Sequence, residues 1–302
     1  MTNKKIGFIG VGLMGHGMAK NLIEKGFKVS VMGNRNRAPV DDLVKRGATE
    51  ASSLAEMTKT VDVLFLCVTG TPEVERLVYG ENGILASCRA GQIVADTSTS
   101  QPASTLKIAT DFKPKGVRFI DTPLTRTPVE AEQGRLNTLV GCDAATFEEI
   151  KPVLAAFCEN IFHIGEVGTG HKVKLINNFA TIGQMALIAE SLAACAKLGV
   201  DPKKYFQLVG QGAANSPLFQ NLAGQAVEGN FKSLKFALVN ASKDVRYYTQ
   251  MTAEAGISGN MAAATQQTLL TAINLGFGTP DHMVSELVAA QAKLNGVRVD
   301  GK

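Results

Sequence analysis

The spacing of hydrophobic and polar positions changes about halfway along this chain. In the first half, short apolar runs rich in β-branched residues alternate with stretches whose apolar positions recur at helical spacing. The runs are KIGFIG, KVSVM, VDVLFLCV, QIVADTS, VRFIDTP and NTLVG, followed by IFHIG at residues 161–165. Strands that alternate with helices in this way predict a doubly wound, mostly parallel sheet with helices on both faces, an α/β fold of the nucleotide-binding type.

The second half of the chain has a helical pattern throughout. From about residue 170 to residue 197 the sequence is apolar on most faces, which predicts one long buried helix. From residue 201 to the end, every stretch again has helical spacing, with Gly and Pro at the breaks. We therefore predict an α/β domain over residues 1–165 and an all-helical domain over residues 166–302, joined by the long helix.

Composition and charge describe a packed globular protein with no marked attraction for nucleic acid. Apolar residues make up 45% of the 302 residues, charged residues make up 19%, and Trp is absent. Lys and Arg exceed Asp and Glu by 31 − 27 = 4, and no block of like charges occurs. We expect no nucleic-acid partner, and the mild excess is compatible with a small anionic ligand.

The cysteines and the N-terminal segment bear on compartment. The five cysteines are odd in number and lack CxxC spacing, which favours a reducing cytoplasm. The start MTNKKIGFIGVGLMG is too rich in glycine for a signal peptide, and no other run approaches the ~20 apolar residues of a membrane span. We expect a cytoplasmic protein without a membrane partner, and the sequence has no metal-ligand spacing.

A glycine-rich segment lies between the first predicted strand and the first predicted helix. Gly10, Gly12 and Gly15 have GxGxxG spacing, with Leu13 and Met14 inside the same loop. A dinucleotide pyrophosphate needs glycines there for a tight turn, for close approach of the backbone and for helix–strand contact, and the helix N-terminus faces its charge. A lone GxGxxG is often only a turn, but its place inside a strand–helix–strand unit favours dinucleotide binding.

The end of the second predicted strand bears on which dinucleotide is bound. An NAD site commonly has an acid there, which accepts a hydrogen bond from the ribose 2′-hydroxyl. Here the strand ends in MGNRNR, so Asn34, Arg35 and Arg37 could face a 2′-phosphate instead. This pattern favours NADP, and NAD stays open because the arginines could equally form a solvated loop.

A polar stripe interrupts the long apolar helix. Lys174, Asn177, Asn178 and Thr181 fall at i, i+3, i+4 and i+7, on one helix face. Such a stripe is ordinarily a solvated surface, but this helix is apolar elsewhere, so we expect the stripe to line a cleft between the domains. A lysine there can donate a proton to a carbonyl oxygen as hydride reaches the carbon, and amides beside it can hold the substrate oxygen.

Three motifs taken in order give the chain its resemblance to a known family. The segments GFIGVGLMGHGMAKNL, DTPLTRT and GHKVKLINN resemble those of the β-hydroxyacid dehydrogenases, and the likeness runs over essentially the whole chain. The resemblance implies a Rossmann domain, an interdomain helix, a helical C-terminal domain and a homodimer or homotetramer. It also implies an NAD(P)-dependent oxidoreductase that interconverts a small anionic hydroxy acid and its aldehyde or ketone.

The resemblance also implies roles for single residues. Lys174 matches the family's catalytic lysine, and Asn178 matches the amide that positions the substrate, with Asn177 and Thr181 beside it. Residues implied to contact the cofactor, besides the glycine loop, are Leu66, Cys67, Val68, Thr99 near the nicotinamide, and Lys243 of a Lys243–Asp244 pair.

The elbow DTPLTRT departs from the family's common pattern, D-x-P-V-S-G-G. Where most members hold the substrate carboxylate with a serine and a glycine turn, this chain has Thr125, Arg126 and Thr127. A guanidinium offers a charged, bidentate partner for a carboxylate, sulfonate or phosphate, so we interpret Arg126 as an anion clamp, although a loop salt bridge would also account for it. The elbow is similar to that of members that act on sulfolactaldehyde and on sugar acids such as threonate.

The sequence leaves open three functions other than that of a semialdehyde reductase. One is a sugar-acid dehydrogenase of the threonate type. A second is an imine reductase, against which Lys174 argues, since related imine reductases carry another proton donor at that position. The third is a non-catalytic dinucleotide sensor, which would need neither the polar stripe nor the elbow.

Overall fold

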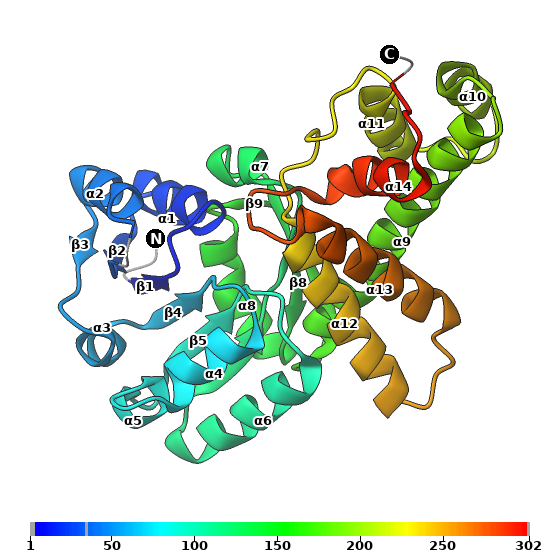
Figure 1. Ribbon diagram of the computed structural model, residues 1–302. Coiled ribbons are helices and arrows are strands. Elements are labelled where there is room, and N and C mark those ends of the chain that lie inside the picture. The colour runs from blue at the N-terminus through cyan, green and yellow to red at the C-terminus, as the bar shows by residue number, and fades with distance from the viewer. Residues whose placement is uncertain (1–3, 34–35, 301–302) are drawn as a thin grey trace. The chain divides into compact units, whose positions relative to one another are not determined.

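The computed structural model describes residues 4–33 and 36–300. It divides into two compact units, the first ending at Lys174 and the second beginning at Leu175. In Figure 1 the first unit runs from blue to green and the second from green to red.

The strands of the first unit form one sheet. Its strands are β1 (Lys5–Ile9), β2 (Lys28–Val31), β3 (Thr49–Glu50), β4 (Val63–Leu66), β5 (Ile93–Asp96), β6 (Arg118–Asp121), β7 (Leu124–Thr125), β8 (Leu136–Gly141) and β9 (Cys158–Gly165). Their order is β3-β2-β1-β4-β5-β6-β8-β7, with β9 also paired to β8. The pairs from β3 to β6 are parallel, β8 runs antiparallel to β6 and β7, and β9 is parallel to β8.

Helices cover both faces of this sheet. They are α1 (Gly15–Glu24), α2 (Ala38–Lys45), α3 (Leu54–Thr60), α4 (Thr71–Tyr79), α5 (Ile84–Ser87), α6 (Pro102–Phe112), α7 (Pro128–Glu132) and α8 (Ala144–Leu154). Along β4 the side chains alternate, so Val63 and Phe65 join the core under α1, α2 and α8, while Leu64 and Leu66 join the core under α3, α4 and α6. A strand buried on both faces has to be apolar at every position, which is why VLFL shows no alternation in the sequence. This confirms the predicted α/β class.

The strands that the hydrophobic pattern did not indicate are β3 and β7. Each is two residues long, TE and LT, and each pairs at or next to an edge of the sheet. A two-residue segment is too short to show a hydrophobic period, and it becomes a strand only through backbone pairing with the adjacent strand.

The long helix expected between the domains is α9 (Thr169–Lys197), which links the two units. By length and composition alone it could cross a membrane, with a mean hydropathy of 1.4 over its most apolar window. Ile182, Met185, Ala189 and Leu192 of α9 are buried in the core of the second unit. Ile176 and Leu187 are exposed, so the helix is buried on part of its surface only, whereas the sequence pattern predicted a buried helix.

The second unit is helical, as predicted. Besides most of α9 it contains α10 (Pro202–Val209), α11 (Pro217–Ala226), α12 (Leu238–Glu254), α13 (Asn260–Ala272) and α14 (Leu287–Asn295). Short turns lie between the last two, a π-helical one at Ile273–Phe277 and a 3-10 one at Val284–Glu286. Leu222, Val245, Leu269 and Leu287, which are at most 1% exposed, lie in one apolar core.

Two helical glycines allow a test of the packing of α1. A Cβ built on Gly17 would lie 2.5 Å from the backbone carbonyl carbon of Ala131 in α7, whereas a Cβ on Gly183 in α9 has its nearest neighbour, Thr265 Oγ1, at 3.6 Å. We expect Gly17→Ala to lower the free energy of unfolding by about 1–3 kcal/mol, because overpacking outweighs the gain in helix propensity. Gly183→Ala is the matched control and should be neutral or stabilising. Equal thermal shifts in both variants would contradict close α1–α7 packing.

Candidate active site

The glycine loop connects β1 to α1 and is shaped by contacts that forbid side chains. Gly10 has φ +91°, and a Cβ there would lie 2.1 Å from the carbonyl oxygen of Cys67. A Cβ on Gly15 would lie 2.0 Å from the carbonyl oxygen of Gly10. A Cβ on Gly12 would meet nothing within 4 Å. Gly10 and Gly15 are therefore required by the fold, while Gly12 leaves open space beside the loop.

The N-terminus of α1 is suited to an anion. Its N-cap residue, Met14, provides no side-chain hydrogen bond, and the first turn contains no acidic residue. Leu13 in the same loop is 79% exposed. Main-chain amides at a helix start with no carboxylate among its first residues attract a phosphate, so this loop fits the pyrophosphate of a dinucleotide.

The loops after β4 and β5 lie beside this glycine loop at the carboxyl ends of the parallel strands. Leu66 is buried at the end of β4, and the amide of Cys67 donates to the carbonyl oxygen of Ile9. The amide of Val68 donates to Ser98 Oγ at 3.0 Å, and Thr99 follows, half-buried. Burial raises the pKa of the Cys67 thiol to about 11, so it stays protonated at neutral pH and is not a nucleophile.

The end of β2 lies beside an acid from the neighbouring strand β3, which the sequence pattern did not indicate. Asn34 and Arg35, the residues expected at the ribose, lie outside the described residues. Arg37 donates to both carboxylate oxygens of Glu50 in β3, at 2.5 and 2.8 Å, and to Asp41 at 3.1 Å. These hydrogen bonds hold the pKa of Glu50 below its usual range. An Arg37–Glu50 pair thus lies next to the end of β2.

In the elbow, the unusual arginine is engaged in an ion pair. Arg126 adopts φ +79°, a left-handed conformation that favours glycine. Its Nη1 donates to Glu159 Oε2 on β9 and to the carbonyl oxygen of Arg135. The backbone therefore has a conformation that a glycine would readily adopt, while the side chain is turned toward Glu159.

The two threonines of the elbow have different environments. Thr125 Oγ1 accepts a hydrogen bond from Asn137 at 3.1 Å. Thr127 is the N-cap of α7, where its hydroxyl accepts from the amide of Val129 and donates to Glu130 at 2.5 Å in a capping box. The hydroxyl of Thr127 is therefore used within its own turn.

Lys174 lies at the sixth residue of α9 and is half-buried. The first turn of this helix is attached to the carboxyl end of β6, since Asp121 accepts hydrogen bonds from the amides of Gly168 and His171, both at 2.7 Å. Lys174 thus follows directly from a turn anchored on the sheet.

The remaining polar residues of α9 divide between buried and exposed. Asn178 is 8% exposed and donates from Nδ2 to Asp244 Oδ2 at 2.7 Å. Lys243 Nζ lies 3.0 Å from the other oxygen of Asp244. Asn177 is exposed, and Thr181 donates to its carbonyl oxygen at 3.0 Å. Asn178 is thus fixed by an acid, whereas Asn177 is open to solvent.

Sequence reasoning missed several acids that contact the candidate residues. Glu50, Asp121 and Glu159 each bond a residue or segment proposed for the site. Only Asp121 had a signal in the sequence, because an acid inside the apolar run VRFID is buried and therefore needs partners. Glu50 and Glu159 look like surface residues until the strands are paired.

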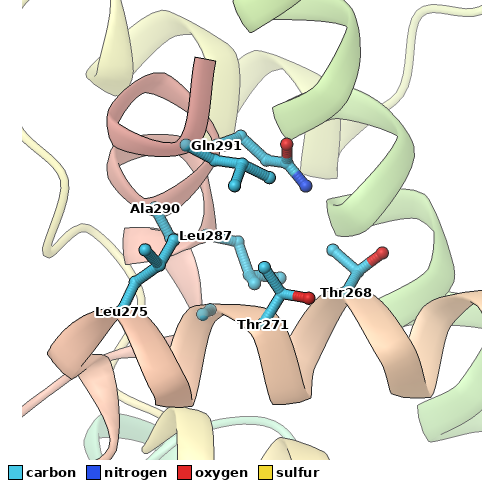
Figure 2. A pocket seen from close by; sticks show the side chains of 8 residues that line it. Thr268, Thr271, Leu275, Leu287, Ala290 and Gln291 are labelled. Carbon is cyan, nitrogen blue, oxygen red and sulfur yellow. The ribbon is translucent and has the colours of Figure 1, made fainter. Parts of the chain in front are cut away.

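A shallow pocket in the second unit carries none of this chemistry. It lies between α13 and α14 and is lined by residues that include Thr268, Thr271, Leu275, Leu287, Ala290 and Gln291, shown in Figure 2. None of its lining residues is titratable. Across residues 4–33 and 36–300, no group of three His, Cys, Asp or Glu side chains could hold a metal ion.

Comparison with known families agrees with these features. Residues 5–165 match the NAD binding domain of 6-phosphogluconate dehydrogenase, and residues 168–288 match the NAD-binding domain of NADP-dependent 3-hydroxyisobutyrate dehydrogenase. The structure of 3-hydroxyisobutyrate dehydrogenase from Mycobacterium tuberculosis has the same fold, with a TM-score of 0.84 at 22% identity over 95% of this chain and 99% of that one.

Two curated relatives are similar over almost the whole chain. The 2-(hydroxymethyl)glutarate dehydrogenase of Eubacterium barkeri is 32% identical over 98% of both chains. The chloroplastic glyoxylate/succinic semialdehyde reductase 2 of Arabidopsis thaliana is 32% identical over 95% of this chain and 80% of its own length. The cofactor is a nicotinamide dinucleotide, and the activity is that of an NAD(P)-dependent hydroxyacid dehydrogenase or semialdehyde reductase. This chain belongs to the β-hydroxyacid dehydrogenase family.

Proposed function

We propose that this enzyme interconverts a small anionic semialdehyde or ketone and its hydroxy acid, with Lys174 as general acid and base. One observation carries the proposal. The glycine loop, the segments after β4 and β5, and the first turn of α9 that leads into Lys174 all lie at the carboxyl ends of the parallel strands of one sheet. Ligands of open α/β sheets bind at this edge.

The residues of the chain divide the chemistry among them. The bound nicotinamide supplies or accepts the hydride. In reduction, Lys174 donates its proton to the carbonyl oxygen, and in oxidation it takes the proton back from the hydroxyl. Asn178 directs its Nδ2 toward Asp244, so its Oδ1 is left to accept a hydrogen bond from the substrate hydroxyl.

The proposed anion clamp can act without losing the Arg126–Glu159 pair. Both contacts of the Arg126 guanidinium use Nη1. Its Nε and Nη2 donors are left for a carboxylate, sulfonate or phosphate, and Thr125 can add its hydroxyl proton. Thr127 contributes by holding the start of α7 rather than by binding the anion with its hydroxyl.

A substrate panel tests the function. C3 and C4 hydroxy acids and semialdehydes with carboxylate, sulfonate or phosphate tails, threonate and one cyclic imine are assayed with NAD and NADP by absorbance at the nicotinamide band. Turnover of an anionic hydroxy acid supports the proposal. A better rate on the imine, or tight cofactor binding without turnover of any acid, would contradict it.

Replacement of Lys174 tests the proton-transfer role. We expect Lys174→Ala to lower kcat by 10²-fold or more, the scale of a lost general acid, while the Kd of the cofactor stays within about threefold. Lys172→Ala removes an exposed lysine from the same helix and is the matched control, expected to keep full turnover. Full activity in Lys174→Ala would remove the assignment.

Replacement of Arg126 tests the clamp. Because φ +79° suits glycine, Arg126→Gly should fold normally, raise KM for anionic substrates by about tenfold or more and change the ranking of the three tails. Arg135→Ala removes the other arginine that contacts Glu159 and should leave the ranking as it is. An unchanged ranking in Arg126→Gly would show that its side chain serves only the ion pair.

The cofactor is proposed to be NADP, in line with the NADP-dependent family matched by residues 168–288. Arg37 neutralises Glu50, and without it that carboxylate would disfavour a 2′-phosphate and suit a ribose hydroxyl. We expect Arg37→Ala to shift the ratio of kcat/KM toward NAD by about tenfold. Arg46→Ala, which breaks a pair with Asp42 at the end of α2, is the control. A ratio that stays constant in Arg37→Ala would exclude this pair from cofactor choice.

The thiols and the family bear on the compartment and the assembly of this protein. All five cysteines are free thiols, which supports a reducing compartment such as the cytoplasm. We propose a homodimer or homotetramer, to be measured by light scattering after gel filtration.

A further inference from the structure

A buried polar cluster lies at the carboxyl ends of β5 and β6, where α9 begins. We call Asp96, Asp121 and His171 the His171 cluster; all three side chains are 0% exposed. The His171 ring lies 3.8 Å from Asp96 and 4.0 Å from Asp121. Burying a charged group costs free energy of folding unless the group is paired and hydrogen-bonded. We therefore ask what the cluster contributes to the protein.

Asp121 holds the start of α9 against the sheet. Its two oxygens accept the amides of Gly168 and His171, as a capping side chain does at a helix N-terminus. A Cβ on Gly170 would lie 2.3 Å from the carbonyl oxygen of Leu139, and one on Gly141 would lie 2.4 Å from Asp121 Oδ1. The first turn therefore sits so close to the sheet that no side chain fits between them.

His171 connects that turn to the loops that follow β4 and β5. Its Nε2 faces the carbonyl oxygen of Ser98 at 3.2 Å, so this nitrogen carries a proton and donates it. Its Nδ1 bonds the hydroxyl of Thr105 in α6 at 2.8 Å. Ser98 in turn accepts the amide of Val68. One ring thus joins α9 to the residues adjoining Thr99 and to the loop after β4.

Lys174 follows His171 by three residues, less than one helical turn. Any tilt or fraying of the first turn of α9 would move the ammonium of Lys174 relative to the loops after β4 and β5. A displacement of about 1 Å at a proton donor can cost about 10²-fold in rate.

We propose that His171 and Asp121 are positioning residues, which fix Lys174 relative to the loops after β4 and β5 without touching the substrate. The inference rests on the proposed role of Lys174. It assigns a function to a buried cluster that the reaction itself does not use.

The kinetic test uses His171→Ala, His171→Gln and Thr105→Val. We expect His171→Ala to lower kcat at least tenfold with KM changed less than threefold and the cofactor Kd within twofold, and to displace the limb of the pH–rate profile that belongs to the proton donor. His171→Gln keeps an N–H donor and should recover part of the rate. Thr105→Val, which removes the hydroxyl that bonds Nδ1, should lower kcat about threefold. A kcat within twofold of wild type in His171→Ala, or equal losses in kcat and cofactor affinity, would overturn the proposal.

His163→Gln is the matched control. This histidine also bonds a main-chain carbonyl through Nε2, to Cys142 at 2.7 Å, but it lies on β9 and bonds neither loop. Its kcat should stay within twofold of wild type, and a loss as large as that of His171→Gln would reduce the effect to general destabilisation.

A second readout does not depend on turnover. Hydrogen exchange of a peptide over residues 168–178 should become at least tenfold faster in His171→Ala, while a peptide over residues 183–195 keeps its rate. Unchanged exchange over residues 168–178 would overturn the inference even if Lys174→Ala is inactive. Faster exchange together with full activity of Lys174→Ala would instead support the anchoring and remove the proposed function of Lys174.

Discussion

The carboxylate of Asp121 at the start of α9 is the contact on which the arrangement of the first unit depends. It ends β6, accepts two amides from the turn that begins α9, and does so where both neighbouring glycines leave no room for a side chain. Burial raises the pKa of Asp121, against the opposing effects of His171 and the two amides. Burial of this carboxylate is unfavourable, but the buried carboxylate joins the sheet to the helix that carries Lys174.

The same edge of the sheet supplies the cofactor loop, and here too geometry limits the residue types. Gly10 and Gly15 lie so close to neighbouring backbone that a Cβ on either would clash, whereas a Cβ on Gly12 would enter open space. The loop is therefore rigid on the protein side and open on the ligand side, which pre-organises the amides for a phosphate.

Acids hold several of the basic and amide groups that we assign to the site. Glu159 pairs with Arg126, Glu50 with Arg37, and Asp244 with both Asn178 and Lys243. An ion pair of this kind costs conformational freedom, but it holds a long side chain in one direction before the ligand arrives. The proposed roles of Arg126, Arg37 and Asn178 therefore involve these acid partners as well as the residues themselves.

The sequence by itself determined the fold class, the long helix and the family, because strand runs buried on both faces, a GxGxxG loop and a lysine–asparagine stripe are local patterns. It identified the elbow as unusual through Arg126. The direction of that side chain, however, depends on Glu159, which is 33 residues away in the sequence. The two residues come into contact only because the strands of the sheet pair. The two-residue strands β3 and β7 and the anchoring of α9 by Asp121 and His171 likewise needed the tertiary structure. Local periodicity specifies elements, whereas pairs between distant acids and bases exist only once the sheet has brought their strands together.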